Sequence, residues 1–121
     1  MQTLFLIGQI VLGVYFIKAG LHHFTQLEGM AGYAASKHVP APKLAVGVTG
    51  LMLLLGGVGV LFQFQLVWAY GLLIAFLVLA AFTMHRFWVE QDPNMKMANQ
   101  VNFQKNLALA AALLMLLWLQ A

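Results

Sequence analysis

The sequence predicts an all-α integral membrane protein, a bundle of four spanning helices with a short interfacial helix between the first and the second. Of the 121 residues, 63% are hydrophobic and only 7% are charged, whereas soluble domains have roughly 45–50% and about 25%. The apolar residues form runs of membrane-spanning length, and the charged residues lie mostly between them. A soluble domain of this size could not bury so much apolar surface, so lipid must surround most of the chain.

The four apolar runs cover approximately residues 3–21, 44–62, 66–84 and 101–119. A helix of about 20 apolar residues crosses roughly 30 Å of hydrocarbon. Helices are preferred to strands for runs this long because each helix satisfies its own backbone hydrogen bonds. The first run has no basic segment at its start, so we expect a retained helix rather than a cleaved signal peptide. Residues 1–121 are expected to form a single transmembrane domain.

The connection between the first two runs contains a short segment with helical spacing. Thr25-Gln26-Leu27-Glu28 matches a capping box, in which the Thr and Glu side chains satisfy free amides at a helix start. Apolar residues then recur at helical spacing until Val39-Pro40-Ala41-Pro42 ends the pattern. We therefore predict a short helix that lies at the membrane interface.

The basic side chains are all expected on one side of the membrane. The join between the second and third runs, Gln63-Phe64-Gln65, is uncharged, whereas the longer connections 22–43 and 85–100 contain most of the charged residues. Lys18 and Lys105 are placed at the helix ends nearest those connections. The positive-inside rule then puts both long connections in the cytoplasm and both termini on the outer side.

Small residues in the second run predict close helix packing. Gly47, Gly50 and Gly57 fall on a narrow stripe at 3.6 residues per turn, which lets another helix approach closely. We interpret this stripe as a packing surface within the chain or between copies, so a homo-oligomer stays open as an alternative. Such spacings are common in membrane helices and do not indicate a particular chemistry.

The predicted topology brings polar side chains from three helices to one membrane level. A cation deep in the membrane is costly unless its side chain reaches the interface, forms an ion pair or contacts water. Lys18 and His22, which lies one turn later on the same face, form the deepest part of the cluster. A simpler interpretation is that these side chains contact lipid headgroups from the helix ends. The candidate ligand-binding residues are Lys18, His22, His23, His85, Arg86, Lys105 and Asn106.

Hydrogen-bond donors beside apolar walls suit a polar, anionic or quinone-like headgroup. Histidines on two helices could instead ligate haem or another metal. However, His22 and His23 are adjacent and point in different directions, and no spaced pair matches a haem motif. The sequence therefore favours quinone over haem as a cofactor and predicts no metal site.

The amino-acid composition argues against several other classes of function. The chain has 0 Cys, so it cannot perform dithiol exchange or hold an iron–sulfur cluster, and a redox role would require a bound cofactor or a partner. Its 6 Lys and Arg residues lie between apolar runs rather than in a basic patch with surface aromatics. No nucleic-acid partner is therefore indicated.

The candidate residues lie in segments that resemble the DoxX family of small four-helix bacterial membrane proteins. These segments cover nearly the whole chain in the family's order. Many members have an acidic residue shortly before the paired glycines, whereas Met52-Leu53-Leu54-Leu55 is apolar here, so the role of that carboxylate is absent or altered. The matching segments are Phe16-Ile17-Lys18-Ala19-Gly20-Leu21-His22-His23-Phe24, Val39-Pro40-Ala41-Pro42, Gly56-Gly57, His85-Arg86-Phe87-Trp88 and Lys105-Asn106-Leu107-Ala108-Leu109.

The resemblance implies a quinone-linked or redox-associated component of the bacterial cytoplasmic membrane, because the name-giving branch is similar to subunits of a thiosulfate:quinone oxidoreductase. We expect a non-catalytic subunit or scaffold that holds a lipid-soluble redox molecule at its basic face and serves a separate redox enzyme. The alternatives are a small-molecule carrier, a lipid-binding membrane protein, and a catalytic oxidoreductase with its own cofactor. A carrier would need polar groups near the midplane, and the middle of every predicted helix is apolar.

Overall fold

The computed structural model describes residues 1–120 and contains 4 helices that are long and apolar enough to cross a membrane. The structure confirms the all-α membrane fold and the presence of a short helix between the first two spanning helices. The elements are α1 (Gln2–Thr25), α2 (Leu27–Ser36), α3 (Pro42–Leu61), α4 (Leu66–Thr83), the single 3₁₀ turn η1 (Phe87–Val89) and α5 (Pro93–Gln120).

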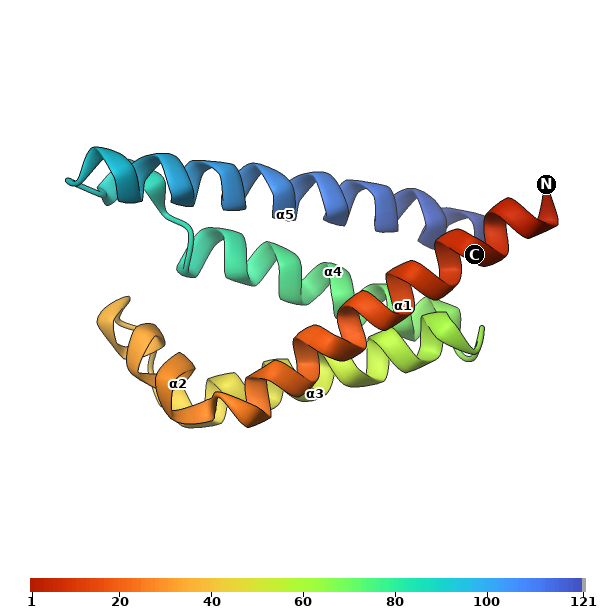
Figure 1. Ribbon diagram of the computed structural model, residues 1–121, viewed down its shortest axis with the longest axis horizontal. Coiled ribbons are helices and arrows are strands. Elements are labelled where there is room, and N and C mark those ends of the chain that lie inside the picture. The colour runs from red at the N-terminus through yellow and green to blue at the C-terminus, as the bar shows by residue number, and fades with distance from the viewer. Residues whose placement is uncertain (121) are drawn as a thin grey trace.

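The long helices form an open bundle in the order α1, α3, α4, α5 (Figure 1). Each packs against the next, but within residues 1–120 the backbone of α1 makes no close contact with that of α5. Side chains from all four helices still meet in one core, where Phe16, Leu53, Leu73 and Leu113 are each less than 2% exposed. The bundle is therefore open between α1 and α5, where a groove runs along the two helices.

The two ends of the bundle differ in chemistry. The start of α1 and the end of α5 lie beside the α3–α4 turn, whereas α2 and η1 lie at the opposite end (Figure 1). The uncharged turn is tight, with positive φ angles of 53° at Gln63 and 50° at Gln65. The Gln63 side-chain amide donates to Gln9 of α1 at 2.7 Å, and Gln9 donates to the Leu61 carbonyl at 2.7 Å. These bonds hold α1 to the uncharged end.

The fourth spanning helix begins at Pro93, well before the predicted start near Val101. Proline is favoured in the first turn of a helix, where its missing N–H is not needed. Asp92 supports the same start, because its side chain accepts a hydrogen bond from the Asn94 N–H at 3.0 Å and its carbonyl accepts from the Lys96 N–H at 2.8 Å. The prediction was wrong because hydropathy marks only the apolar part of a helix, and the first two turns of α5 are polar.

The predicted capping box at Thr25-Gln26-Leu27-Glu28 is not formed. The Thr25 hydroxyl donates to the His22 carbonyl at 3.3 Å, and the Gln26 N–H donates to the same carbonyl at 2.9 Å. Because α1 continues to Thr25, the Gln26 N–H has a backbone partner, and α2 begins without a side-chain cap. The Glu28 carboxylate instead pairs with Lys43 at 3.0 Å.

Glycines allow α3 to approach α1 closely. A Cβ atom added at Gly57 would lie 2.8 Å from the Ile17 nitrogen, and one added at Gly50 would lie 2.7 Å from the Cβ of His23. Gly47 faces open space, with nothing within 4 Å of an added Cβ. Gly47 therefore does not belong to this contact, because three residues of α-helix rotate it about 60° away from Gly50.

A second pair of glycines, which the sequence interpretation missed, packs α3 against α4. A Cβ added at Gly56 or Gly59 would lie 2.6 Å from Leu73 or Ala69, respectively. Helix α3 is thus packed closely against α1 on one side and against α4 on another.

Candidate functional site

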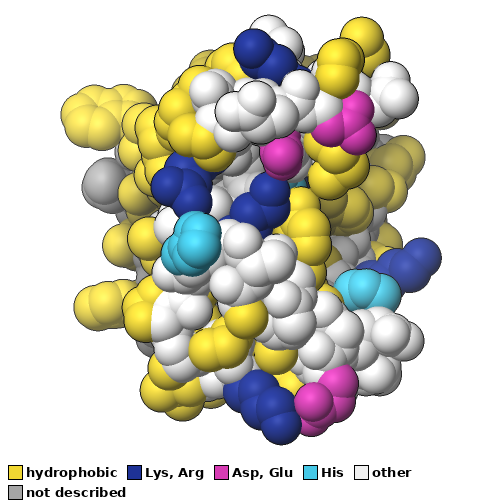
Figure 2. Space-filling view, turned by 90° about the vertical axis from the view of Figure 1, so that its left-hand side faces the viewer, with side chains coloured by type: hydrophobic (Ala, Val, Ile, Leu, Met, Phe, Trp, Pro, Cys, Tyr) yellow, Lys and Arg dark blue, Asp and Glu magenta, His cyan; other side chains and the backbone are white. Residues whose placement is uncertain are grey.

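A cavity of about 490 Å³ lies at the charged end, bounded by the end of α1, α2, the start of α3 and the end of α4. Helix α2 forms one side of it, because Ala31 and Ala34 are buried against Val46 of α3. Figure 2 looks onto this end of the molecule, where basic, acidic and histidine side chains lie among apolar ones. Since three histidines line the space, His22, His23 and His85, we call it the histidine cavity.

His23 is the most firmly held of these histidines. Its Nδ1 lies 3.0 Å from the Val46 carbonyl oxygen, and a carbonyl can only accept, so Nδ1 carries the hydrogen. The Thr49 hydroxyl, 3.2 Å from the same nitrogen, donates to the Ala45 carbonyl at 2.7 Å. In a neutral ring, Nε2 is therefore the unprotonated nitrogen, and no group in residues 1–120 forms a hydrogen bond with it. The ring also packs edge-on against Phe76, with 5.7 Å between centroids.

The other two histidines enter the cavity from different elements. His22 is exposed near the end of α1, whereas His85 follows α4 and is half-buried. The Nδ1 of His85 is buried and has no hydrogen-bond partner within the described part of the chain. Most buried side-chain polar atoms have such a partner, so His85 leaves hydrogen-bonding capacity unused beside the cavity.

The remaining predicted site residues do not line the histidine cavity. Lys18 is exposed, and its neighbour Ile17 contacts Gly57 in the half of α3 farther from the charged end. Lys18 therefore lies deeper than predicted, because α1 extends to Thr25. Asn106 is buried, and Lys105 lines a separate groove between α1 and α5. The structure thus brings three of the seven predicted residues together around one cavity.

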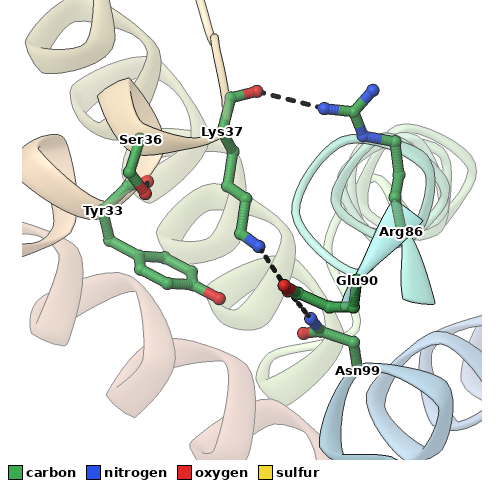
Figure 3. Close-up of polar contacts among 6 residues, drawn as sticks. All are labelled: Tyr33, Ser36, Lys37, Arg86, Glu90 and Asn99. Atoms are coloured by element: carbon green, nitrogen blue, oxygen red, sulfur yellow. Dashed lines mark hydrogen bonds and ion pairs between the residues drawn. The ribbon is translucent and has the colours of Figure 1, made fainter. Parts of the chain in front are cut away.

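Arg86 belongs to a polar network that joins α2 to the start of α5 (Figure 3). Lys37 Nζ lies 3.0 Å from Glu90 Oε2, and the Asn99 side-chain amide donates to the same oxygen at 2.9 Å. The Arg86 guanidinium donates to the Lys37 carbonyl at 3.3 Å. We call Lys37, Arg86, Glu90 and Asn99 the closing network, because it connects α2 with the chain on the far side of the cavity.

The closing network is partly shielded from solvent. The side chains of Lys37 and Glu90 are 17% and 20% exposed, respectively. Tyr33 connects it to the cavity, because its ring lies 5.5 Å from Lys37 Nζ and also lines the cavity. The sequence interpretation missed Glu90 and Asn99. The available signal was that Glu90 is one of only 3 acidic residues in a basic chain.

Within residues 1–120, no group of three or more His, Asp or Glu side chains could hold a metal ion. The polar atoms at the histidine cavity are imidazole nitrogens, hydroxyl groups and the Gln26 amide, set among apolar side chains. Such a site can bind a ligand by hydrogen bonds to its polar part and by apolar contact with the rest.

Comparison with known protein families finds a match that covers helices α1 to α4. The family model for DoxX matches residues 4–86, which include all the residues that line the histidine cavity. The match ends before Glu90 and α5. No curated protein and no solved structure matches the chain. Since residues 4–86 make up more than half of the sequence, the protein belongs to the DoxX family.

Proposed function

We propose that this membrane protein is a non-catalytic subunit or scaffold of a quinone-linked redox system, and that its histidine cavity binds the headgroup of a quinone or quinol. The observation that most supports this function is the geometry of His23. The Val46 carbonyl holds its Nδ1–H, which leaves Nε2 as a hydrogen-bond acceptor at an apolar cavity. A quinol hydroxyl is a suitable donor to this nitrogen.

The rest of the cavity fits the same ligand class. Its volume of about 490 Å³ lies within the roughly 300–1,000 Å³ usual for small-molecule sites. Gln26 and Tyr33 can donate hydrogen bonds to a carbonyl oxygen, and Met30, Phe76 and Leu79 provide apolar contact for a ring and the start of a tail. The site therefore offers both donors and an acceptor, as a molecule that alternates between carbonyl and hydroxyl forms requires.

The redox chemistry itself is assigned to a partner. The chain has 0 Cys, so any thiol or iron–sulfur chemistry must be supplied by another protein. We propose that this partner is a redox enzyme that approaches the charged end, which the positive-inside rule assigns to the cytoplasm of a bacterium.

Binding of decylubiquinone and decylubiquinol to the purified protein tests the proposal. His23→Phe keeps a ring against Phe76 but removes Nε2, and we expect quinol affinity to fall about tenfold, the usual worth of one good hydrogen bond. His38→Asn is the matched control, because His38 is exposed outside the cavity and has a positive φ of 65° that Asn tolerates. The proposal fails if neither form binds, or if both variants bind the quinol equally well.

An absorption spectrum and a lipid extract of the purified protein separate the alternatives. Retained quinone supports the proposal, whereas haem or flavin bands would favour a catalytic oxidoreductase. A second function, lipid binding, is supported by the groove between α1 and α5, which is a different site from the histidine cavity.

A further inference from the structure

The helices form two arms that separate toward the charged end (Figure 1). The first arm contains α1, α2 and α3, and the second contains α4, η1 and α5. The arms are joined near the uncharged turn, where Gly56 and Gly59 of α3 pack closely on α4. Within residues 1–120, neither α1 nor α2 makes close backbone contact with α4, η1 or α5. The histidine cavity lies in this separation, because both arms supply residues to its lining.

The residues that line the cavity and are also exposed mark the place where it opens. They form two lips, one from the end of α1 together with α2 and the other from α4. Tyr33 on the first lip is 41% exposed, and Leu79 on the second is 54% exposed. We call this opening the α2–α4 slot, and its exposed residues are His22, Gln26, Gly29 and Tyr33 on one lip and Leu79 and Thr83 on the other.

The α4 lip of the slot lies within the lipid hydrocarbon. Helix α4 starts at Leu66, directly after the turn at the opposite membrane surface, and Leu79 is about 20 Å farther along the helix at 1.5 Å per residue. Because the hydrocarbon is roughly 30 Å thick, Leu79 faces acyl chains. The Thr83 hydroxyl donates to the Leu79 carbonyl at 2.6 Å, so this lip presents no free donor to the lipid.

Polar contacts close only the outer end of the slot, at Lys37. Its Nζ lies 3.0 Å from Glu90 Oε2, and its carbonyl accepts from Arg86 at 3.3 Å, so both contacts run from the end of α2 to the segment after α4 (Figure 3). In the described part of the chain, no other side-chain hydrogen bond or ion pair joins the two arms. The deeper part of the slot, beside Leu79, is therefore not held shut by polar groups.

We propose that a lipid-soluble ligand enters the histidine cavity sideways from the bilayer, through the α2–α4 slot, and leaves its hydrocarbon tail between the two lips. An apolar opening within the hydrocarbon lets a long tail stay in lipid while the headgroup enters. A route from the aqueous side would expose the tail to water and would pass the partly shielded pair of Lys37 and Glu90. The inference takes its ligand, a quinol, from the proposed function, while the position of the slot is tested without any ligand.

A nitroxide label at Gly29→Cys tests the slot in the absence of a ligand. A Cβ added at Gly29 meets nothing within 4 Å, and the chain has 0 Cys of its own. Ser36→Cys is the control, because Ser36 is exposed at the other end of α2 and does not line the cavity. In liposomes, we expect the Gly29 label to show the higher ratio of collisions with oxygen, which concentrates in hydrocarbon, to collisions with a water-soluble nickel chelate. An equal or lower ratio would place the opening in water and overturn the proposal.

A reversible bridge across the slot tests whether the ligand uses it. Gly29→Cys combined with Thr83→Cys puts one thiol on each lip, and a flexible bis-methanethiosulfonate reagent can join them. Bridging before decylubiquinol is added should block its binding. Bridging after binding should slow its release by at least about tenfold, as expected when a closed lid limits release, and dithiothreitol should reverse both effects. Each single variant, capped with methyl methanethiosulfonate, gives the rates without a bridge.

The outcomes separate this proposal from the proposed function. Unchanged entry and release in the bridged protein would place the entrance elsewhere. Failure of the reagent to join the two thiols would show that the lips do not face each other, and either result overturns the proposal. If the unaltered protein binds no decylubiquinol, the proposed function fails instead, and the oxygen and nickel comparison alone supports or overturns the slot.

Discussion

Lys37 and Glu90 are joined by an ion pair with 3.0 Å between Nζ and Oε2, although 53 residues separate them in the sequence. Lys37 directly follows α2, and Glu90 directly follows η1. Because α2 forms a wall of the histidine cavity, this pair fixes that wall relative to the end of α4. We therefore expect the stability of the cavity to depend on an ion pair that does not itself line the cavity.

Breaking the pair should destabilise the protein. Glu90→Leu leaves the Lys37 ammonium and the Asn99 amide without their acceptor, and we expect the free energy of unfolding to fall by about 1–3 kcal/mol. Reversible unfolding in mixed micelles of sodium dodecyl sulfate measures the change. The exposed pair Glu28–Lys43, whose side chains are 79% and 66% exposed, is the control, and Glu28→Leu should cost no more than about 1 kcal/mol.

The exchange Lys37→Glu with Glu90→Lys provides a further check on this interpretation. It should recover part of the lost stability, since the two charges still oppose one another, while Asn99 would no longer find a carboxylate at its original position. If Glu90→Leu and Glu28→Leu have equal effects, the partly shielded pair does not hold α2 in place.

The glycine contacts predict unequal effects of alanine along one helix. Gly57→Ala would place Cβ 2.8 Å from the Ile17 nitrogen and 3.0 Å from the Gly13 carbonyl oxygen. Because backbone atoms cannot rotate away, we expect a loss of about 1–3 kcal/mol in unfolding free energy. Gly47→Ala meets nothing within 4 Å and should be neutral or slightly stabilising, since alanine favours helix more than glycine by about 1 kcal/mol. Equal melting temperatures for the two variants would contradict the close contact.

The membrane orientation can be measured with single cysteines, because the chain contains 0 Cys. We expect Gln120→Cys to react with a membrane-impermeant maleimide in intact cells, since the positive-inside rule places both termini outside the cytoplasm. Asn94→Cys, at the charged end, should react only after the membrane is permeabilised. The reverse pattern would invert the topology and place the histidine cavity at the outer face.

The long helices could be predicted because apolar runs of spanning length have few alternative structures in lipid. Helix ends were less predictable, since hydropathy does not report polar helical turns such as those after Pro93. The same limitation misplaced Lys18. The predicted helix end near residue 21 put Lys18 about one turn from that end, whereas α1 continues to Thr25 and the neighbouring Ile17 contacts Gly57.

The candidate site was predictable only at the level of topology. The sequence indicated that His22, His23 and His85 share one end of the bundle, but the cavity depends on how α2 packs against α3, through small residues such as Ala31 and Ala34. The pairing of Lys37 with Glu90 is a long-range contact between two connections. No local spacing encodes such a contact, so charge alone could only suggest that Glu90 would find a basic partner.

Lys18 offers a quantitative test of its depth. It is exposed, and its neighbour contacts Gly57, which lies about 22 Å along α3 from Pro42 at 1.5 Å per residue. A lysine near the middle of a spanning helix costs roughly 2.5–3.5 kcal/mol on insertion, whereas leucine is favourable by a few tenths. Lys18→Leu should therefore lower the apparent insertion free energy of α1 by about 2–4 kcal/mol, measured by glycosylation mapping in microsomes.

Lys43→Leu, in the first turn of α3, should change the apparent insertion free energy of that helix by less than about 1 kcal/mol, because an ammonium at a helix end reaches the interface. Equal effects at the two positions would indicate that Lys18 lies at the membrane surface.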